Sequence, residues 1–300
     1  MKKNLLGTSE IEVSEIGFGC MSLPTGLTEA SYIIEEAISH GINYFDTADL
    51  YNKGENEELV GKALKQHRKD IVLATKVGNQ WSKDSDEVKW NATKPYIIEQ
   101  VHNSLKRLQT DYIDLYQLHG GMITDNTEET IDAFESLKKE GLIREYGISS
   151  IRPNVIKRFL EQSDIVSIMM QYSLFDRRPE EYLDEIGVAG KSVVTRGTLA
   201  KGLLTNEGPQ RAGKMDGYMN YNAEESADVL KKLMDIHPNV HALSLHSVLQ
   251  NSTIASAVTG ASSSAQIKDT ISAYETAVTA EQVEQAKQVT KKDHYQEHLE

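Results

Sequence analysis

The sequence of 300 residues predicts an α/β fold, a closed (β/α)8 barrel, and three observations support that prediction. Eight short apolar runs recur along the chain, and most are separated by segments with the periodicity of an amphipathic helix. Each run is almost continuously apolar, which is typical of parallel strands covered by helices. Eight strands is the number that closes into a barrel, and about 250 residues is the usual size of that fold.

Expected strands and helices alternate from the N-terminus onward. The strands are predicted at residues 16–21, 42–46, 71–76, 113–117, 143–148, 165–171, 192–196 and 254–258. Helices are predicted most clearly at residues 28–40, 95–108 and 127–139, where apolar side chains return every three or four positions on one face. Gly41 and Gly141 follow two of these helices and fit C-terminal caps, because glycine readily adopts the left-handed conformation that ends a helix.

An open doubly wound sheet is the structural alternative to a barrel. Its nucleotide-binding form carries the motif G-x-G-x-x-G in the first turn from strand to helix. The corresponding turn here runs from Gly17 to Ser22 and lacks the third glycine. The barrel is therefore the favoured interpretation, although periodicity does not by itself show that the sheet closes.

Four segments lie outside the repeating pattern. Residues 4–13 predict a short N-terminal hairpin that closes one end of the barrel, and residues 282–294 predict an extra C-terminal helix packed outside it. Residues 78–93 and 203–222 are expected to be long loops, and both follow a strand, which places them over the active-site face. Without an internal repeat or interdomain linker, residues 1–300 are expected to form a single domain.

Composition excludes several classes of function. Lys and Arg number 32 against 45 Asp and Glu, and the resulting net charge of −13 disfavours a nucleic-acid partner. Cys20 is the only cysteine, so an intrachain disulfide and a thiolate zinc site are excluded, and no metal site is predicted. The N-terminus lacks the apolar stretch of a signal peptide, and no window reaches the ~18 consecutive apolar residues of a spanning helix. We therefore expect a cytoplasmic protein without a membrane partner.

Titratable side chains stand at or just past the ends of three consecutive predicted strands. Asp46 ends the second strand, Lys76 ends the third and His119 follows the fourth. Taken singly, each has an ordinary explanation: a cap, a lysine that reaches solvent, or a hydrogen-bonded structural histidine. Together they indicate a site, because buried charges are costly unless paired and the carboxyl ends of barrel strands carry the catalytic groups.

The segments around these residues form an ordered set of motifs. They are Phe45-Asp46-Thr47-Ala48-Asp49-Leu50-Tyr51, the strand with Lys76, the run from Thr110 to His119, and the runs from Gly141 to Ser149, Leu199 to Leu204 and Thr259 to Ser263. With the opening Ile16-Gly17-Phe18-Gly19-Cys20-Met21, this set resembles the aldo-keto reductase family over essentially the whole chain. No single motif would be specific, whereas the linked set is.

The resemblance implies reduction of an aldehyde or ketone by hydride transfer from NAD(P)H, with a catalytic tetrad of Asp46, Tyr51, Lys76 and His119. A phenol is a weak acid at neutral pH, with a reference pKa of about 10. A cation beside its oxygen makes it a stronger acid, and Lys76, paired with Asp46, would supply that charge. Tyr51 would then protonate the forming alkoxide as a general acid, while His119 orients the carbonyl oxygen.

The resemblance also implies the residues that hold the cofactor. Gly19, Cys20 and Met21 would line the nicotinamide end, and Ser149 and Gln171 would hold its carboxamide. Arg196, Gly197, Thr198, Leu199 and Lys201 would cover the pyrophosphate, and Gly260, Ser262, Ser263 and Gln266 would hold the adenosine.

This sequence departs from the family pattern at several places in the cofactor site, among them Ser150 and Thr270, where Asn is common in relatives. Relatives committed to NADPH usually place Arg or Lys near residues 262–266 to meet the 2′-phosphate, whereas this chain has serines, Gln266 and, one turn on, Lys268. Relatives also often stack an aromatic ring on the nicotinamide where Arg196 stands here. NADPH is the favoured cofactor and NADH the alternative.

Substrate and partner predictions are coarser. A small-molecule carbonyl compound is expected, with Trp81 and Trp90 of segment 78–93 shaping an apolar pocket. Two rival functions belong to other classes: a reductase-like subunit of a potassium channel, and a lyase that forms a Schiff base on Lys76. Nothing in the sequence suggests the docking surface that a channel subunit would need. The lyase needs Lys76 as a neutral amine, and the nearby Asp46 would keep it protonated. The sequence determines neither the physiological substrate nor the oligomeric state.

Overall fold

A computed structural model describes residues 1–299, and its central feature is the closed barrel that the sequence predicts. Eight strands pair in parallel around the barrel in the spatial order β10-β11-β14-β3-β4-β5-β8-β9. These strands are β3 (Ile16–Gly19), β4 (Tyr44–Asp46), β5 (Val72–Val77), β8 (Ile113–Leu118), β9 (Ile143–Ser149), β10 (Ser167–Gln171), β11 (Ser192–Arg196) and β14 (Ile254–Gly260). The open-sheet alternative is thereby ruled out.

The predicted strands match the observed ones closely, and no boundary differs by more than two residues. Strand β4 begins at Tyr44, two residues after the predicted start. The preceding residue, Asn43, is hydrogen-bonded to Ser14 of the N-terminal hairpin. Its backbone N–H donates to Ser14 Oγ at 3.0 Å, and its side-chain oxygen accepts from the backbone N–H of Ser14 at 2.7 Å. The bottom of the barrel is thus tied to the N-terminal segment before the strand ladder begins.

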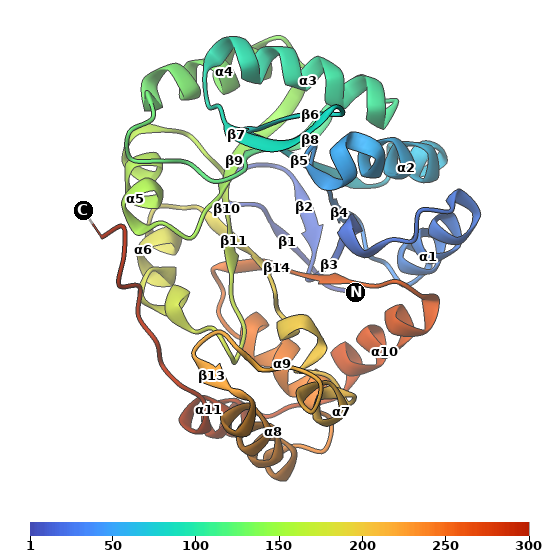
Figure 1. The fold of residues 1–300 in the computed structure, drawn as a ribbon, viewed down its shortest axis with the longest axis vertical. Helices are drawn as coiled ribbons and strands as arrows, with labels where there is room; N and C mark the ends of the chain where they lie inside the picture. The colour runs from blue at the N-terminus through green and yellow to red at the C-terminus, as the bar shows by residue number, and fades with distance from the viewer. Residues whose placement is uncertain (300) are drawn as a thin grey trace.

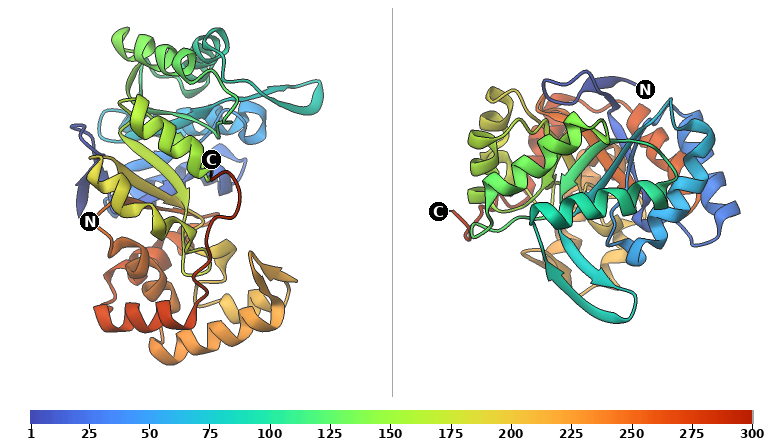
Figure 2. Two further views of the ribbon diagram at one scale, coloured as in Figure 1. Left: turned by 90° about the vertical axis from the view of Figure 1, so that its left-hand side faces the viewer. Right: turned by 90° about the horizontal axis from the view of Figure 1, so that it is seen from above.

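Helices surround the barrel as an outer layer (Figures 1 and 2). Those between or after the barrel strands are α1 (Leu27–Ser39), α2 (Glu55–Leu64), α3 (Lys94–Leu108), α4 (Thr127–Lys139), α5 (Pro153–Gln162), α6 (Leu183–Val188), α9 (Val240–Leu249) and α10 (Ser264–Glu275). The three helices predicted from periodicity correspond to α1, α3 and α4. Gly41 and Gly141 follow α1 and α4 with φ of 85° and 77°, which confirms their role in ending these helices.

The N-terminal hairpin is also confirmed. Strand β1 (Lys3–Leu5) pairs antiparallel with β2 (Glu12–Ser14), and the hairpin covers the end of the barrel opposite the carboxyl ends of the strands. Leu6 and Val13 are fully buried there and pack with Tyr44 and Leu115 from inside the barrel. These apolar contacts plug the barrel floor, so the open end is the one where the strands finish.

Two segments predicted as unstructured loops contain secondary structure, and both predictions were wrong in that respect. Residues 78–93 include an antiparallel hairpin of β6 (Asn79–Ser82) and β7 (Ser85–Trp90), which stands out from the body of the molecule (Figure 2). Residues 203–222 include α7 (Gly208–Ala212) and the short pair β12 (Gly217–Tyr218) and β13 (Tyr221–Asn222). Strand β7 is polar and exposed almost throughout, and β12 and β13 have only two residues each, so periodicity did not reveal them.

The remaining helices lie beyond the barrel layer. Helix α8 (Ala223–Ile236) follows β13 and begins with a capping box formed by Asn222 and Glu225. The predicted C-terminal helix is present as α11 (Ala280–Val289), but it starts two residues earlier and ends five residues before His294. In residues 1–299, no helix combines the length and apolar character that crossing a bilayer would need.

The close contact between α2 and α3 can be tested by a substitution that should lower stability. Gly61 of α2 lies against the end of α3, and a Cβ on it would stand 2.5 Å from the backbone Cα of Leu108. Because backbone cannot move aside cheaply, Gly61→Ala should lower the free energy of unfolding by about 1–3 kcal/mol. Urea unfolding monitored by circular dichroism measures the change.

The matched control is Gly213→Ala. Gly213 has a φ of −65°, and the nearest atoms to a Cβ added there would be 3.9 Å away, so this change should stay within about 0.5 kcal/mol. Equal effects of the two substitutions would show that the α2–α3 crossing is not as tight as described.

Candidate active site

The four predicted tetrad residues meet at the carboxyl ends of neighbouring strands. Asp46 is the last residue of β4, Lys76 lies near the end of β5, and His119 follows β8 directly. Strands β4, β5 and β8 are adjacent in the barrel, so their ends share one stretch of its rim. Tyr51 opens the short 3-10 helix η2 (Tyr51–Gly54) that follows β4. The structure therefore brings all four side chains to the mouth of the barrel.

Lys76 and Asp46 form a buried ion pair. The Lys76 ammonium donates to Asp46 Oδ2 at 2.6 Å and to the backbone carbonyl of Thr47 at 2.7 Å, and the lysine side chain is only 1% exposed. Burial alone would lower the pKa of Lys76, but the charge of Asp46 and the contact with Tyr51 outweigh it, and the net pKa is raised. The ammonium is therefore held charged at neutral pH.

Tyr51 stands over this cation. The Lys76 Nζ lies 5.2 Å from the centroid of the Tyr51 ring. Hydrogen bonding with that tyrosine is one of the causes that raise the pKa of Lys76. The Tyr51 ring meets the imidazole of His119 edge-on, with 6.1 Å between centroids and 84° between planes. A phenol, a buried ammonium and an imidazole thus converge on one point.

The chain after Tyr51 adopts an unusual backbone. Asn52, Lys53 and Gly54 all have positive φ, at 48°, 49° and 84°, a region that residues other than glycine enter rarely. Lys53 Nζ donates to the carbonyl of Ser85 and to Asp86 Oδ1, both at 3.0 Å, which ties this turn to the β6–β7 hairpin. The turn follows Tyr51 directly, and the hairpin contacts help to hold it.

His119 is neutral in this environment. Burial, then the charges of Lys76 and Arg196, lower the pKa of its imidazole to about 3. Its Nδ1 atom is buried and has no hydrogen-bond partner within the described chain. Its backbone N–H donates to the carbonyl of Val77 at 2.7 Å, which fixes the start of the loop after β8. A neutral imidazole can donate one N–H and accept one hydrogen bond.

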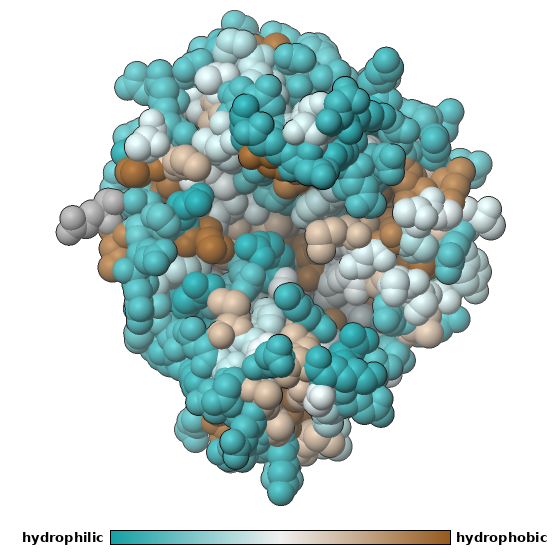
Figure 3. Space-filling model, viewed as in Figure 1, coloured by the Kyte–Doolittle hydropathy of each residue, from teal (hydrophilic) through white to brown (hydrophobic). Residues whose placement is uncertain are grey.

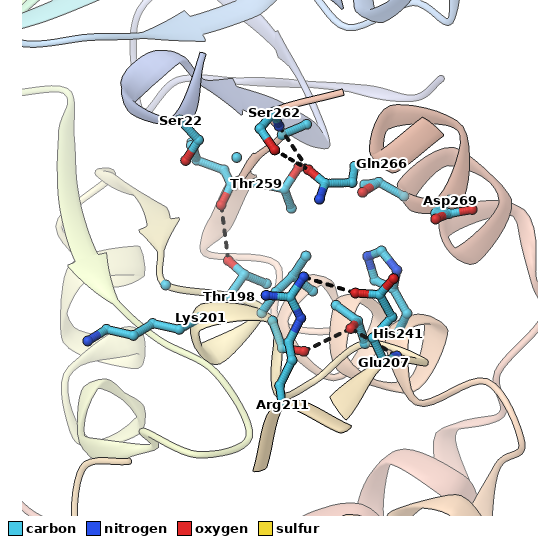
Figure 4. Close-up of a pocket in the computed structure, with 18 of the residues that line it drawn as sticks. Ser22, Thr198, Lys201, Glu207, Arg211, His241, Thr259, Ser262, Gln266 and Asp269 are labelled. Carbon is cyan, nitrogen blue, oxygen red and sulfur yellow. Dashed lines mark hydrogen bonds and ion pairs between the residues drawn. The ribbon is translucent and has the colours of Figure 1, made fainter. Parts of the chain in front are cut away.

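A cleft of about 620 Å³ runs from the barrel mouth to the N-terminal part of α10 (Figure 4). Its walls are the loop after β11, the end of β14 and the first turns of α10. Eight of the predicted cofactor residues line it: Met21, Gly197, Thr198, Leu199, Lys201, Gly260, Ser262 and Gln266. The structure thus gathers the predicted pyrophosphate and adenosine segments around one cavity.

Six predicted cofactor residues lie outside the lining of this cleft: Gly19, Cys20, Ser149, Gln171, Arg196 and Ser263. Gln171 is engaged by the protein, because its Oε1 accepts from Arg196 at 2.7 Å and its Nε2 donates to Asp176 at 2.9 Å. Ser263 caps α10 by accepting from the backbone N–H of Gln266 at 3.3 Å. The Cys20 thiol is fully buried, and burial raises its pKa well above the usual range.

Sequence reasoning missed four titratable residues of the cleft: Glu207, Arg211, His241 and Asp269. Two of them carry buried nitrogen atoms without a hydrogen-bond partner, Arg211 Nε and His241 Nε2. Burial lowers the pKa of His241 to about 4, so it is neutral at pH 7. The position of Glu207 and Arg211 in segment 203–222 was the one signal in the sequence, since that segment was predicted to lie over the active-site face.

The cleft fits an elongated polar ligand such as a nicotinamide dinucleotide. Gly260 lets β14 approach η1 (Cys20–Ser22), since a Cβ there would stand 2.9 Å from Ser22 Oγ. Gly202, at φ 86°, leaves room for Arg211, whose Nε would be 2.8 Å from an added Cβ. These glycines make room for the side chains of the cleft wall, and the unpartnered nitrogens of Arg211 and His241 are the groups left to bind polar atoms of a ligand.

Both predicted substrate tryptophans lie on the β6–β7 hairpin, outside the lining of the cleft, and the structure gives them anchoring contacts. The Trp90 indole packs over Gly78 and Gly120, and its Nε1 donates to Asp125 at 2.9 Å. Trp81 lies against Gly54 and 5.7 Å from the Arg107 guanidinium. The space-filling view is hollowed near its centre, with hydrophobic patches around the rim (Figure 3). Within residues 1–299, no cluster of His, Cys, Asp and Glu is arranged to hold a metal ion.

Comparisons with known proteins agree with this geometry. The family model described as "Aldo/keto reductase family" matches residues 15–291. "Uncharacterized oxidoreductase YqkF" of Bacillus subtilis is 51% identical over 304 residues, covering 99% of each chain. "NADH-specific methylglyoxal reductase" of Escherichia coli is 30% identical over 305 residues, covering 91% of this chain and 93% of its own.

A solved structure extends the similarity to three dimensions. The "aldo-keto reductase AKR11C1 from Bacillus halodurans (holo form)" superposes with a TM-score of 0.94 at 51% identity, over 100% of both chains. The barrel, the strand-end residues and the match over nearly the full length lead to the same conclusion: this chain belongs to the aldo/keto reductase family.

Proposed function

We propose that this oxidoreductase reduces an aldehyde or ketone to the alcohol with NAD(P)H, using Asp46, Tyr51, Lys76 and His119. The observation that supports this most is the buried Lys76–Asp46 ion pair with the Tyr51 ring 5.2 Å from the ammonium. A lysine held charged beside a phenol has one chemical consequence, which is to stabilise the phenolate. That is the property a proton donor to a forming alkoxide needs.

Tyr51 acts as the general acid in this proposal. Its hydroxyl delivers a proton to the carbonyl oxygen as negative charge develops there, and the ammonium of Lys76 stabilises the phenolate that remains. Asp46 keeps Lys76 in place and charged, because an unpaired buried ammonium would tend to lose its proton. In the reverse direction the same groups remove a proton from an alcohol.

His119 binds and orients the carbonyl oxygen. Since its pKa lies near 3, the imidazole is neutral at physiological pH and offers an N–H without competing with Tyr51 as an acid. The buried, unpartnered Nδ1 shows that the surroundings leave this ring with unused hydrogen-bonding capacity. An oriented carbonyl is presented to Tyr51 and to the cofactor in one geometry.

The nicotinamide dinucleotide supplies the hydride when bound, and the protein supplies position and charge. Gly197, Thr198 and Leu199 would lie along the pyrophosphate, with Lys201 as a point charge. Ser262 and Gln266 would lie at the adenosine end, and Met21 toward the nicotinamide. The family resemblance favours NADPH with NADH as the alternative, and the choice depends on the charges at the adenosine end.

The rival Schiff-base lyase is disfavoured by the ion pair. A lysine attacks a carbonyl only as the neutral amine, whereas the net pKa of Lys76 is raised beside Asp46. Borohydride trapping of a carbonyl compound on Lys76 would favour the lyase instead. The substrate is expected to be a small carbonyl compound, with Trp81 and Trp90 of the β6–β7 hairpin shaping an apolar pocket for it.

The role of Tyr51 is tested by Tyr51→Phe. Removing the hydroxyl should lower kcat/KM for aldehyde reduction by about 10²–10⁴-fold, because the proton donor is lost, and should leave cofactor affinity within a few-fold. Steady-state kinetics and a fluorescence titration measure the two. Tyr32→Phe, at an exposed tyrosine on α1, is the matched control. Turnover retained in Tyr51→Phe would refute the assigned role.

The neutral state of His119 generates a pH prediction. With a lowered pKa of about 3, the ring stays neutral as pH falls from 8 to 5, so kcat/KM should show no inflection from His119 in that range. His119→Asn keeps a neutral N–H donor and should retain roughly tenfold more activity than His119→Leu. An inflection near pH 6.5 that disappears in His119→Asn would contradict the neutral assignment.

The role of Trp90 is tested by Trp90→Ala and Trp90→Phe. Alanine should raise KM across a panel of aldehydes, because the indole covers Gly78, which follows β5, and Gly120, which follows His119. Phenylalanine keeps an aromatic ring but loses the hydrogen bond to Asp125, so KM should rise less. If no substrate's KM changed in either variant, Trp90 would be an anchor of the hairpin alone.

A further inference from the structure

The adenosine end of the cleft holds few free positive charges. Two cations line the cleft in the described chain, Lys201 and Arg211, together with two carboxylates, Glu207 and Asp269. The formal charge of this lining is therefore zero. A 2′-phosphate would add a charge of about −1.5 to −2 at neutral pH. The cleft can favour NADPH over NADH only if a free positive charge lies where that phosphate would bind.

Arg211 is already paired. Its Nη2 donates to Glu207 Oε2 at 2.9 Å, one turn earlier in the chain, and its stem rests against Gly202. Figure 4 shows the pair on the wall of the cavity formed by the loop after β11. The guanidinium that would otherwise suit a phosphate thus has the carboxylate of Glu207 beside it, which offsets its charge even though its Nε has no hydrogen-bond partner in the described chain.

The other cations near the site face elsewhere. Lys268 of α10 is absent from the cleft lining, and its Nζ lies 3.5 Å from Glu36 on α1. The Lys201 side chain extends away from Asp269 in Figure 4. The α10 wall itself offers Ser262, Gln266 and the carboxylate of Asp269.

Gln266 is also engaged by the protein. Its Oε1 accepts from the backbone N–H of Ser262 at 2.8 Å and from the hydroxyl of that serine at 3.3 Å. The amide therefore stiffens the turn before α10 and brings no charge to it. A neutral and acidic wall suits hydroxyl groups of a ribose better than a phosphate.

We propose that the Glu207–Arg211 ion pair sets the cofactor selectivity of this enzyme and biases it toward NADH over NADPH. The inference rests on the proposed function, in which the adenosine half of the dinucleotide occupies this end of the cleft. Glu207 withholds the guanidinium from a 2′-phosphate, and Asp269 on the opposite wall repels one. An unphosphorylated ribose meets neither obstacle. This preference is opposite to the one that the family resemblance favours.

Breaking the pair should cost the fold little, which makes it a clean target. The side chains of Glu207 and Arg211 are 67% and 41% exposed, and exposed ion pairs contribute little to stability. Glu207→Gln removes the competing charge while keeping the shape, so Arg211 is freed to pair with a phosphate. The proposal is therefore tested by whether Glu207→Gln increases the affinity for a ligand that carries the 2′-phosphate.

The experiment measures binding of two probes without a nicotinamide, 5′-ADP and adenosine 2′,5′-bisphosphate, by isothermal titration calorimetry. The natural protein should bind 5′-ADP at least as tightly as the bisphosphate. Glu207→Gln should improve bisphosphate affinity relative to 5′-ADP by roughly tenfold, the size expected for freeing one guanidinium to pair with a phosphate. Adding Arg211→Met to Glu207→Gln should abolish that gain. NADH and NADPH titrations should show the same shift.

Asp228→Asn is the matched control. Asp228 pairs with Lys232 at 2.7 Å with the same i, i+4 spacing and similar exposure, but on α8 and outside the cleft lining. It makes the same change in net charge and should leave the ratio of the two affinities unchanged.

Three results would overturn the proposal. They are an affinity ratio that Glu207→Gln leaves unchanged, a tenfold or greater preference of the natural protein for the bisphosphate, and an equal shift in Asp228→Asn. If neither probe bound any variant, the dinucleotide site and the proposed function would fail together. If both probes bound without a change in ratio, the selectivity inference alone would fail.

Discussion

The buried ion pair between Lys76 and Asp46 is the interaction on which the rest of the site depends. Either charge alone would be expensive inside the barrel, at several kcal/mol per ion. The pair exists because β4 and β5 are adjacent parallel strands, with Asp46 in register with Ala74. Lys76, two residues further along β5, projects from the same rim and reaches the carboxylate at 2.6 Å. Barrel closure therefore buries Lys76 away from water and also places Asp46 beside it, and the ion pair offsets the cost of burying the charge.

Tyr51 depends on that pair and on a separate scaffold of polar contacts behind it. Three successive residues with positive φ follow Tyr51, and such a turn persists only where its surroundings hold it. Behind the turn, buried Glu57 accepts from Thr75 Oγ1 and from Arg107 Nε, each at 2.6 Å. Arg107 in turn lies against Trp81 of the β6–β7 hairpin. The hairpin, the turn and β5 are thus joined by side chains, which explains how a surface element can influence the position of the phenol.

Much of this arrangement could be predicted from the sequence, because strand ends are visible as abrupt changes from apolar to polar residues. Asp46, Lys76 and His119 were placed at one rim by counting strands, and the structure puts them there. Tyr51 was different, since nothing in local periodicity distinguishes it among 13 tyrosines; only the resemblance did. The β6–β7 hairpin was missed because its second strand is exposed almost throughout and shows no alternation. Arg211 and His241 were missed because they are 30 residues apart in the sequence, and only the fold brings both to the lining of one cleft.

The contrast between the tetrad and the adenosine end has a physical origin. Proton transfer requires a donor, a charge and an orienting group within narrow limits of distance, so few residue combinations will serve and motifs describe them well. Binding a phosphate requires only a free positive charge within reach of it. A Lys or Arg on any of several walls of a cleft can supply that charge, unless a neighbouring carboxylate already pairs with it. In this chain Lys268 pairs with Glu36 and Arg211 with Glu207, so counting cations in the sequence overstates what the cleft can offer. Selectivity at such an end is determined by how the charges pair, and pairing becomes visible only when the side chains are placed in three dimensions.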